Sequence, residues 1–301
     1  MILVDYSQVA LAAILTFQRE LKGDESEVKN LIRHVTLSTL KSYKKKYGNE
    51  YGELVICCDG RKYWRREVFE HYKANRKKMR DNSDLDWHLI FDTLNEMRID
   101  IAENFPWRVV HVDRAEADDI IAVMTEWAQS SDLVQQGLVE EPQKILILSS
   151  DKDFKQLQLA PFSSGNVRQW SPMQKKFINA TQQEIIEHKI QHIVKGDTGD
   201  GVPNILSKDD VFITEERQKP VSAKRLKDFI DNGFIACRTD EERRNWKRNA
   251  TLVDFQYIPD AVKSDVIGTY LSNKPKGDKM KVMNYLIEHR CRLLLDEIEE
   301  F

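Results

Sequence analysis

Acidic residues follow four of the short apolar segments in this sequence. ILVD and LVICCD each end in one aspartate, while VVHVDRAEADD and ILILSSDKD supply several carboxylates just beyond their apolar runs. These residues are Asp5, Asp59, Glu116, Asp118, Asp119, Asp151 and Asp153. One aspartate after a strand is most often a helix N-cap, but capping does not account for a whole set after four strands. Clustered carboxylates repel one another unless protons or cations intervene, and oxygen ligands select hard ions such as Mg²⁺ or Mn²⁺. The pattern therefore predicts a divalent metal centre.

The three acidic residues of EADD cannot all share one narrow helix face. At about 100° per residue, Glu116, Asp118 and Asp119 spread over about 160° of a helix. Either Glu116 precedes the first full turn, or one of the three caps the helix or supports a ligand without binding the ion.

A second acidic pair lies in the segment IVKGDTGDGVP, where Asp197 and Asp200 are three residues apart in a glycine-bounded turn. Taken alone, this composition is equally typical of a surface turn. With the carboxylates above, the pair brings the candidate ligands to nine. The formal net charge of the chain is −3, so without these nine groups it would be +6. Most of the negative charge is therefore assigned to one candidate pocket.

A basic segment, residues 61–80, contrasts with the acidic remainder of the chain. It contains nine basic and two acidic residues, a local charge of +7, so the rest of the chain sums to −10. Charge runs are usually solvated helix faces, but beside a carboxylate centre this one suits a phosphodiester substrate. Metal ions there activate water and hold the scissile phosphate, while Lys and Arg neutralise flanking phosphates. Tyr63, Trp64, Phe69 and Tyr72 could stack on bases, although Trp64 and Phe69 are equally suited to packing.

An α/β fold with a parallel sheet is predicted to position these residues. Short β-rich runs alternate with helix-period segments through about the first 170 residues. Strands are predicted over 2–6, 53–58, 107–112 and 144–150, with an edge strand at 167–172, and helices over 7–22, 26–47, 84–104 and 115–129. Beyond about Thr181 the segments are helical. We therefore predict an α/β core over 1–180 and a helical region over 181–301, with sites at the carboxyl ends of the strands.

Composition limits the class of protein. The chain has 301 residues, of which 41% are hydrophobic and 32% are charged, which excludes a disordered or fibrous protein. It contains no apolar run of about 20 residues and no basic leader, so we expect a cytoplasmic protein without a membrane span. The four cysteines, with Cys57 and Cys58 adjacent, fit neither a disulfide framework nor a zinc site, and we expect reduced, buried thiols.

The ordered motifs ILVDYSQ, VICCDG, YWRRE…HYKANRKK, EADDIIA, LILSSDKDF, QWSP and KGDTGDGVP resemble the flap-endonuclease (5′ nuclease) family along nearly the whole chain. The resemblance implies a PIN-like parallel-sheet core with a helical arch and a helical C-terminal region. It further implies a 5′→3′ exonuclease and flap endonuclease acting on RNA/DNA and DNA/DNA duplexes. Such an enzyme removes RNA primers from lagging-strand fragments during phage-type DNA replication.

The same resemblance assigns roles to individual residues. The nine carboxylates would hold two Mg²⁺ ions, replaceable by Mn²⁺, and we expect Asp118 to be essential for catalysis. The arch would cover about residues 61–86, with Lys73 and Arg76 on one helix face at the scissile phosphate. The predicted nucleic-acid-binding residues are Arg65, Arg66, Tyr72, Lys73, Arg76, Lys77 and Lys78. We expect the stretch from about Tyr63 to Asp86 to be mobile in the free protein and to order around the 5′ strand.

The resemblance also implies a helix-hairpin-helix-like DNA-binding segment over about 181–232. Many relatives carry a glycine-rich hairpin there that holds a monovalent ion, whereas this chain reads GDTGDGVPNILSKDDVFITEER, without a second glycine cluster. The monovalent site therefore lacks its usual glycines. Expected partners are DNA and RNA/DNA duplexes with 5′ ends or flaps. A single-stranded-DNA-binding protein and a sliding clamp are family expectations, although neither terminus carries a recognisable clamp-binding peptide.

Three other functions account for the sequence less completely. A nuclease-fold binding protein that has lost catalysis would be expected to lack carboxylates, and none is missing. A PIN-type ribonuclease shares the acidic sheet edge but does not explain the basic segment or GDTGDG. A HAD-like phosphatase requires Asp-x-Asp after its first strand, which ILVDYS lacks.

Overall fold

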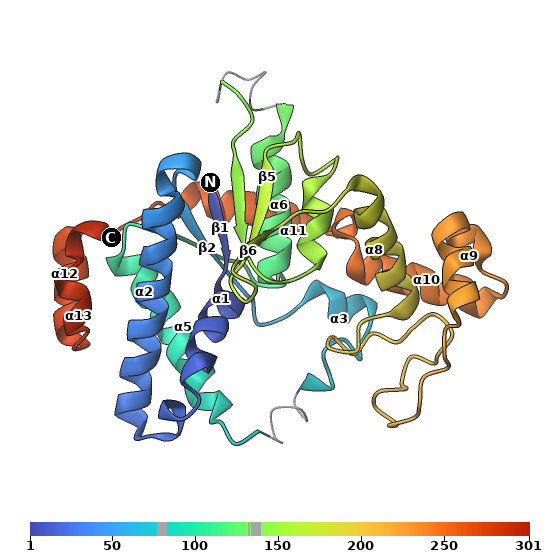
Figure 1. Cartoon of the computed structure of the whole chain (residues 1–301), viewed down its shortest axis with the longest axis horizontal. Helices are drawn as coiled ribbons and strands as arrows, with labels where there is room; N and C mark the ends of the chain where they lie inside the picture. The colour runs from blue at the N-terminus through green and yellow to red at the C-terminus, as the bar shows by residue number, and fades with distance from the viewer. Residues whose placement is uncertain (77–82, 132, 134–139) are drawn as a thin grey trace. The chain divides into compact units, whose positions relative to one another are not determined.

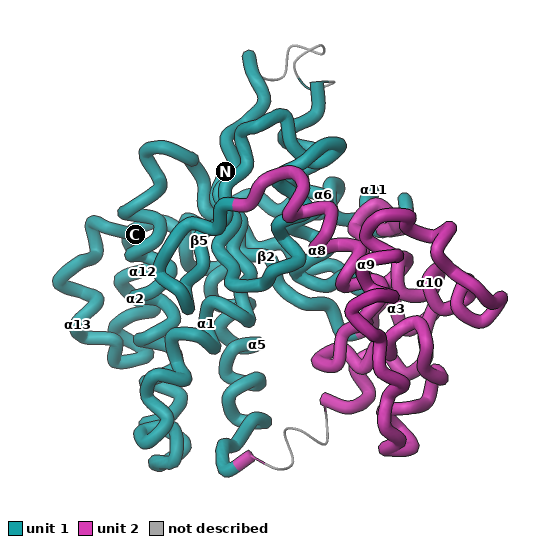
Figure 2. Tube along the Cα trace, turned by 45° about the vertical axis from the view of Figure 1, so that its right-hand side comes forward, with its two compact units in different colours: residues 1–61, 84–179, 260–301 teal, residues 62–83, 180–259 magenta. Residues whose placement is uncertain are grey.

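The computed structural model describes residues 1–76, 83–131, 133 and 140–301. The chain forms two compact units, which Figure 2 draws in separate colours. Unit 1 contains residues 1–61, 84–179 and 260–301, and unit 2 contains residues 62–83 and 180–259. The predicted division at residue 180 coincides with a change of unit. The structure differs from the prediction elsewhere, because the basic segment from Lys62 onward belongs to unit 2 and the last part of the chain returns to unit 1.

Unit 1 is built around a six-stranded sheet with the spatial order β3-β2-β1-β4-β5-β6. The strands are β1 (Ile2–Asp5), β2 (Leu54–Cys58), β3 (Arg108–His111), β4 (Ile145–Leu148), β5 (Val167–Ser171) and β6 (Lys176–Ile178). Neighbours from β3 to β5 run parallel, and β6 pairs antiparallel with β5. The predicted parallel α/β core is confirmed. The edge assignment for 167–172 is wrong, because β6, a three-residue strand too short to give a periodic signal, covers that edge.

Helices cover both faces of the sheet (Figure 1). Helices α1 (Tyr6–Ile14), α2 (Glu25–Tyr51) and α5 (Trp87–Asn104) pack on one face, and α6 (Ala117–Gln129) and α11 (Asp260–Ser272) pack on the other. Side chains alternate along a strand, so Ile2 and Val4 enter the core under α1 and α2 while Leu3 faces the opposite side. This arrangement buries both faces of the strands, as their continuous apolar runs require.

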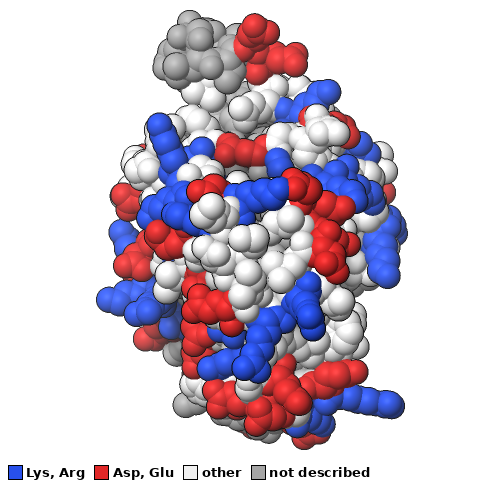
Figure 3. Space-filling view, turned by 90° about the vertical axis from the view of Figure 1, so that its left-hand side faces the viewer, with Lys and Arg blue, Asp and Glu red and all other residues white. Residues whose placement is uncertain are grey.

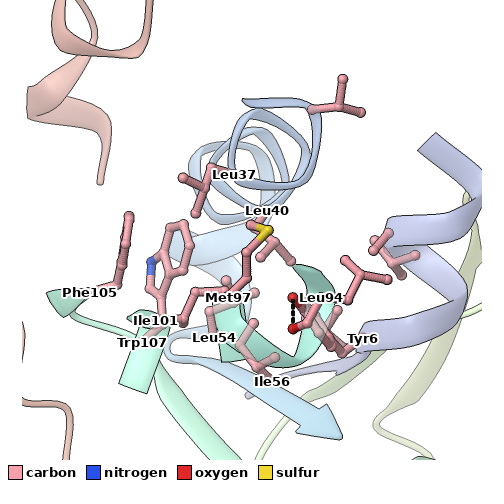
Figure 4. Packing of buried hydrophobic residues seen from close by; sticks show 14 of the residues in the cluster. Tyr6, Leu37, Leu40, Leu54, Ile56, Leu94, Met97, Ile101, Phe105 and Trp107 are labelled. Atoms are coloured by element: carbon pink, nitrogen blue, oxygen red, sulfur yellow. Dashed lines mark hydrogen bonds between the residues drawn. The ribbon is translucent and has the colours of Figure 1, made fainter. Parts of the chain in front are cut away.

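The larger core lies between the sheet and the three helices α1, α2 and α5 (Figure 4). Side chains from α2 and α5 meet the strands there, and Figure 4 labels Leu37, Leu40, Leu94, Met97, Ile101, Leu54 and Ile56 among them. The Tyr6 hydroxyl, buried in this core, donates a 3.0 Å hydrogen bond to the Leu94 carbonyl. Its polar atom is thereby satisfied, which keeps the cost of burying a tyrosine low.

The C-terminal segment of unit 1 packs against this core through α12 (Lys279–Glu288) and α13 (Arg292–Leu295). The ring of Phe301 stacks on Trp107, with centroids 5.6 Å apart. Gly277 crosses the end of α5 so closely that a Cβ atom would lie 2.3 Å from the Asn104 backbone, so only glycine fits there. The last residues therefore complete the α/β core.

Unit 2 is helical, as predicted for the chain beyond Thr181. The α-helices in the described part of this unit are α3 (Trp64–Val68), α8 (Gln182–Lys195), α9 (Ala223–Asn232) and α10 (Asp240–Val253). Thr181 and Glu184 form a capping box at the start of α8, and Gly196, with φ of 68°, ends that helix. Helices α8 and α9 with their connection occupy the segment in which we predicted a helical hairpin.

The cysteines and the charged surface agree with what the composition predicts. All four cysteines are buried and unbonded to one another, as predicted. Figure 3 shows a face on which basic and acidic side chains are interspersed. Among the described residues, no helix combines the length and apolarity that a bilayer span needs.

Candidate active site

The Ser149 hydroxyl, just after β4, links two of the predicted ligands, Asp5 and Asp151, by hydrogen bonds. Asp5, the last residue of β1, is 7% exposed and accepts a 2.9 Å hydrogen bond from the Ser149 hydroxyl. The same hydroxyl accepts a 3.1 Å bond from the backbone N–H of Asp151. Asp151 in turn accepts a 2.8 Å bond from the N–H of Asp153. Asp5, Asp151 and Asp153 are thus brought to one edge of the sheet, at the carboxyl ends of its strands.

Asp59 is held against the ends of β1 and β3. Its carboxylate accepts hydrogen bonds from the Ser7 hydroxyl and from the N–H of Ala117, both at 3.0 Å. Gly60 makes this approach possible, because a Cβ atom there would lie 2.4 Å from the Val112 carbonyl oxygen. The Gly60 N–H donates to the Ala115 carbonyl at 2.8 Å. The CDG sequence therefore joins Asp59 to the start of α6.

The acidic residues of EADD have different positions and contacts at the beginning of α6. Glu116 is the N-cap residue and forms a reciprocal capping box with Asp119, whose carboxylate accepts from the Glu116 N–H at 2.9 Å. Both side chains are buried, whereas Asp118 is partly exposed. Both sequence alternatives therefore hold, since Glu116 precedes the helix and also caps it together with Asp119. Asp119 supports the helix start, and Asp118 is the most accessible carboxylate of the three.

Burial and neighbouring charge perturb the central carboxylate. Burial, and secondarily the charge of Asp59, raise the pKa of Asp5 to about 7, although hydrogen bonds from Ser149 and Gln8 oppose the shift. The charge of Asp151 acts in the same direction as that of Asp59. A carboxylate in this setting needs either a proton or a cation at neutral pH. The cluster therefore has the electrostatics of a cation site.

The two remaining predicted ligands, Asp197 and Asp200, lie in the GDTGDG turn of unit 2. The Asp197 carboxylate lies 3.2 Å from His192 Nε2 and accepts from the Asp200 N–H at 3.1 Å. Although burial acts in the opposite direction, the hydrogen bond and charge of His192 lower the pKa of Asp197. Their assignment to the same centre as the carboxylates of unit 1 stays a prediction.

Asp200 is the anchor of the basic segment. Its carboxylate accepts a 2.9 Å hydrogen bond from the Tyr72 hydroxyl, lies 3.6 Å from Lys73 Nζ and pairs with Arg76. Lys73 has a φ of 60°, and its N–H donates to the Asp200 carbonyl at 2.7 Å. Residues 70–75 form turns, so the prediction that Lys73 and Arg76 share one helix face is wrong. A turn, and not a helix, brings the Lys73 and Arg76 side chains to the same carboxylate, that of Asp200.

Several predicted nucleic-acid-binding residues have structural contacts of their own. Arg65 is 3% exposed and donates to the Leu252 carbonyl at 2.8 Å, and Tyr72 is buried. Arg66 is exposed and donates to the Tyr72 carbonyl. In this conformation Arg65 and Tyr72 are therefore packing residues. Lys77 and Lys78 lie outside the described residues.

The aromatic residues of the basic segment also pack. Trp64, Phe69 and Tyr72 are at most 5% exposed, and Phe69 and Tyr72 contact Val202 and Leu252. Of the two uses considered for Trp64 and Phe69, packing is the one observed. The expectation of mobility over residues 63–86 includes 77–82, which lie outside the described residues, and stays a prediction.

Sequence reasoning missed the residues that orient the carboxylates. Ser7, Ser149 and Gln169 carry no charge, and Gln169, 1% exposed, donates to the carbonyls of Ser149 and Asp151 at 2.9 and 2.6 Å. Ser7 and Ser149 lie two residues from a predicted ligand, which was the available signal. Gln169 lies far away in sequence, and only the pairing of β4 with β5 brings it close.

Comparisons with known proteins fit this geometry. Residues 1–191 match the family model of the 5′-3′ exonuclease N-terminal resolvase-like domain, and residues 184–301 match that of the T4 RNase H C-terminal domain. Ribonuclease H of Enterobacteria phage T4 is 33% identical over 310 residues, which cover 99% of this chain and 95% of that protein. The flap endonuclease Xni of Shewanella denitrificans is 25% identical over 189 residues, 60% of this chain and 64% of that protein.

The solved structures show the same fold. The bacteriophage T5 D15 protein co-crystallized with metal ions has a TM-score of 0.55 at 14% identity, covering 96% of this chain and 97% of that one. A complex of the T5 D15 flap endonuclease with DNA and metal ions has a TM-score of 0.54 at 15% identity, with 96% and 98% covered. Since one family model matches its first 191 residues and a phage ribonuclease H is 33% identical along nearly its whole length, this chain is a member of the 5′-3′ exonuclease and flap endonuclease family.

Proposed function

We propose that this protein is a divalent-metal-dependent 5′→3′ exonuclease and flap endonuclease that removes RNA primers from lagging-strand fragments. Its substrates would be RNA/DNA and DNA/DNA duplexes with 5′ ends or flaps. Family membership supports the nuclease activity, and identity to the phage T4 ribonuclease H supports an RNA-containing substrate. The main support from the structure is the set of hydrogen-bonded carboxylates around Asp5. The raised pKa of Asp5 indicates that a cation would be favourable at this position.

The donor set fits Mg²⁺, with Mn²⁺ as a substitute, because every candidate ligand is a carboxylate oxygen. We infer that Asp5, Asp59, Asp118 and Asp151 hold two ions, with Asp197 and Asp200 as further ligands. Ions held there would supply activation of a water molecule near neutral pH and neutralisation of charge on the scissile phosphate. Ser7, Ser149 and the Ala117 N–H fix the carboxylates in advance through the hydrogen bonds described above.

The basic segment would hold the substrate strand. Lys73 and Arg76 already face a carboxylate, that of Asp200, so a phosphate would replace one anion by another. This exchange keeps both cations paired in the free and bound states, which limits the desolvation cost of binding. We infer that the pair contacts the reacting phosphate, and that Arg66, Lys77 and Lys78 contact flanking phosphates.

The biological setting follows from the relatives. We infer action in the cytoplasm of a bacterial host during phage DNA replication, together with a single-stranded-DNA-binding protein and a sliding clamp. The support is the extent of the match to a phage T4 protein.

Digestion of 5′-labelled flap, nicked and RNA/DNA substrates, with and without Mg²⁺, tests the proposal. We expect Mg²⁺-dependent release of short 5′ products from all three. Asp118→Asn is the inactive variant, and Asp113→Asn is its matched control, because Asp113 is an exposed aspartate of the loop that leads into α6. Tight substrate binding without cleavage by the wild type would instead favour the rival function, a nuclease-fold binding protein.

A further inference from the structure

A cavity of about 460 Å³ opens beside the carboxyl end of β4 in unit 1. One wall is the segment 150–155, and the other is the β5–β6 hairpin, which lies beside β4 at the edge of the sheet (Figure 1). The cavity is lined by three lysines, Lys152, Lys155 and Lys176, but by only one carboxylate, that of Asp151. Its volume falls in the range of small-ligand sites.

The three lysines are available to a ligand. Within the described part of the chain, none of them has a carboxylate oxygen within 4.0 Å or a side-chain hydrogen bond, whereas lysines elsewhere in unit 1, such as Lys41 and Lys263, form ion pairs. Lys152 and Lys155 are three residues apart at the start of a 3₁₀ helix (Asp153–Gln158). Because that helix has three residues per turn, their side chains project from the same side. Like charges placed together in this way favour an anion between them.

The walls of the cavity are fixed by hydrogen bonds. The hydroxyls of Ser150 and Ser171 lie 2.8 Å apart, and the Met173 N–H donates to the Ser150 hydroxyl at 3.1 Å. Lys176 is opposite Ser171 in the β5–β6 ladder. These bonds tie the hairpin to the loop after β4, so the backbone that carries the lysines is held in place before any ligand arrives. A preorganised site loses less entropy on binding.

The cavity borders the candidate metal centre at one residue, Asp151. Asp151 lines it, and the Asp151 N–H donates to the Ser149 hydroxyl that contacts Asp5. An anion in the cavity would therefore lie next to the carboxylates that we expect to hold the metal ions. A polyanion that places one phosphate at the metal centre and its neighbours in the cavity would use both the carboxylates and the lysines.

We propose that Lys152, Lys155 and Lys176 form a subsite for backbone phosphates of the substrate strand next to the cleaved position. The inference rests on the proposed function. Each lysine neutralises about one phosphate, so the subsite adds to affinity and to its salt dependence without taking part in the chemical step.

The test compares two variants of equal charge. The first is Lys152→Ala/Lys155→Ala/Lys176→Ala. The control replaces Lys22, Lys45 and Lys274, exposed lysines of unit 1 outside the cavity, by Ala. Binding of a 5′-flap DNA duplex is measured across a salt titration in Ca²⁺, and cleavage is measured at saturating substrate in Mg²⁺. Circular dichroism and thermal unfolding establish that both variants fold.

We expect the cavity variant to lower the slope of log affinity against log salt by about two to three, while the control variant matches the wild type. The KM should rise and the kcat should stay within about twofold of wild type. A triple Lys→Arg variant should retain wild-type binding, because it keeps the charges.

Equal slopes for the cavity and control variants, with an active wild type, would overturn the inference and leave the proposed function intact. A wild type that neither binds nor cleaves nucleic acid would overturn both. Inorganic phosphate is the second probe. If it binds the wild type but not the cavity variant while the duplex slopes stay equal, the cavity takes a free anion and the strand assignment is wrong.

Discussion

Lys73 Nζ lies 3.6 Å from Asp200 Oδ2, so a predicted phosphate-binding lysine and a predicted metal ligand face each other in the free chain. The backbone strengthens this relationship, because the Lys73 N–H donates to the Asp200 carbonyl at 2.7 Å. Lys73 also adopts a left-handed φ of 60°, which a non-glycine residue rarely adopts without compensating contacts. The pair therefore couples the position of the basic segment to that of the GDTGDG turn.

Replacing both Lys73 and Arg76 by Ala should slow cleavage far more than it weakens duplex binding. The two cations are expected to act on the reacting phosphate, and losing such stabilisation typically costs about 100-fold in rate. Single-turnover cleavage and salt-dependent binding are to be measured on the same flap substrate. The control is Lys45→Ala/Lys274→Ala, which removes two exposed cations outside the basic segment. Normal cleavage at saturation, with a salt slope smaller by about two, would make the pair a docking patch.

Asp118→Asn should abolish cleavage while keeping or tightening substrate binding. The change removes a charge expected to hold a metal ion and also lowers repulsion toward phosphate. Asp5→Asn and Asp151→Asn should behave alike if their carboxylates bind the ions directly. The measurement is single-turnover cleavage beside Asp113→Asn as control. A rate within about tenfold of wild type, ~1.4 kcal/mol in the barrier, would exclude Asp118 from the catalytic set.

Removing the metal should abolish activity but not the fold. The core of unit 1 consists of apolar side chains between the sheet and its helices, and it does not depend on an ion at the sheet edge. In EDTA we therefore expect native circular dichroism without cleavage. Ca²⁺ should bind but support only slow cleavage, because its coordination is looser than that of Mg²⁺. Robust cleavage in excess chelator would refute a metal mechanism.

Gly60→Ala should reduce both stability and activity. A Cβ atom would lie 2.4 Å from the Val112 oxygen and 2.8 Å from the Ala115 oxygen, so the loops that carry Asp59 and Glu116 must separate. Overpacking of this kind typically costs about 1–3 kcal/mol. Gly268→Ala is the matched control, because a Cβ there meets nothing within 4 Å on α11, and it should be neutral or stabilising. The free energy of unfolding in urea and the cleavage rate are to be measured for both variants and compared with the wild type.

The sequence predicted the sheet well because each strand carries its own local signal. Runs such as ILVD and ILIL are apolar on both faces, and the helices between them are long enough to show a period. Strand β6 and the turn at residues 70–75 carry no such signal, since the first has three residues and the second depends on Asp200 far along the chain. The return of residues 260–301 to unit 1 depends on contacts such as Phe301 with Trp107, which no local pattern contains.

The candidate site was predictable in its charged residues and unpredictable in its neutral ones. One aspartate after a strand is common as a helix N-cap, but acidic residues after four apolar runs form a conspicuous pattern. The partners that orient them, Ser149 and Gln169, are ordinary polar residues until the strands pair. The pairing of Lys73 and Arg76 with Asp200 was likewise hidden, because charge alone does not say which carboxylate a cation will meet.

The raised pKa of Asp5 predicts a stability cost that a metal ion or a neutral side chain should remove. Burial and the charge of Asp59 raise that pKa from the ordinary 3.8 to about 7, so between these values the folded chain holds a proton that the unfolded chain releases. The metal-free wild type should therefore lose stability as the pH rises from about 4 through 7. The full shift of about three units corresponds to at most about 4 kcal/mol.

Asp5→Asn isolates this contribution, because the amide keeps the shape of the side chain but does not ionise. In EDTA, we expect the free energy of unfolding of the wild type to fall relative to that of Asp5→Asn between about pH 4 and pH 7. Adding Mg²⁺ at pH 8 should restore the wild type and have little effect on the variant, because a cation that binds only the folded state stabilises it by mass action. The measurement is urea unfolding at each pH, with Asp113→Asn as the control that should follow the wild type. Parallel pH profiles for the wild type and Asp5→Asn would show that Asp5 is ionised without penalty, and the case for a cation at this carboxylate would then rest on geometry alone.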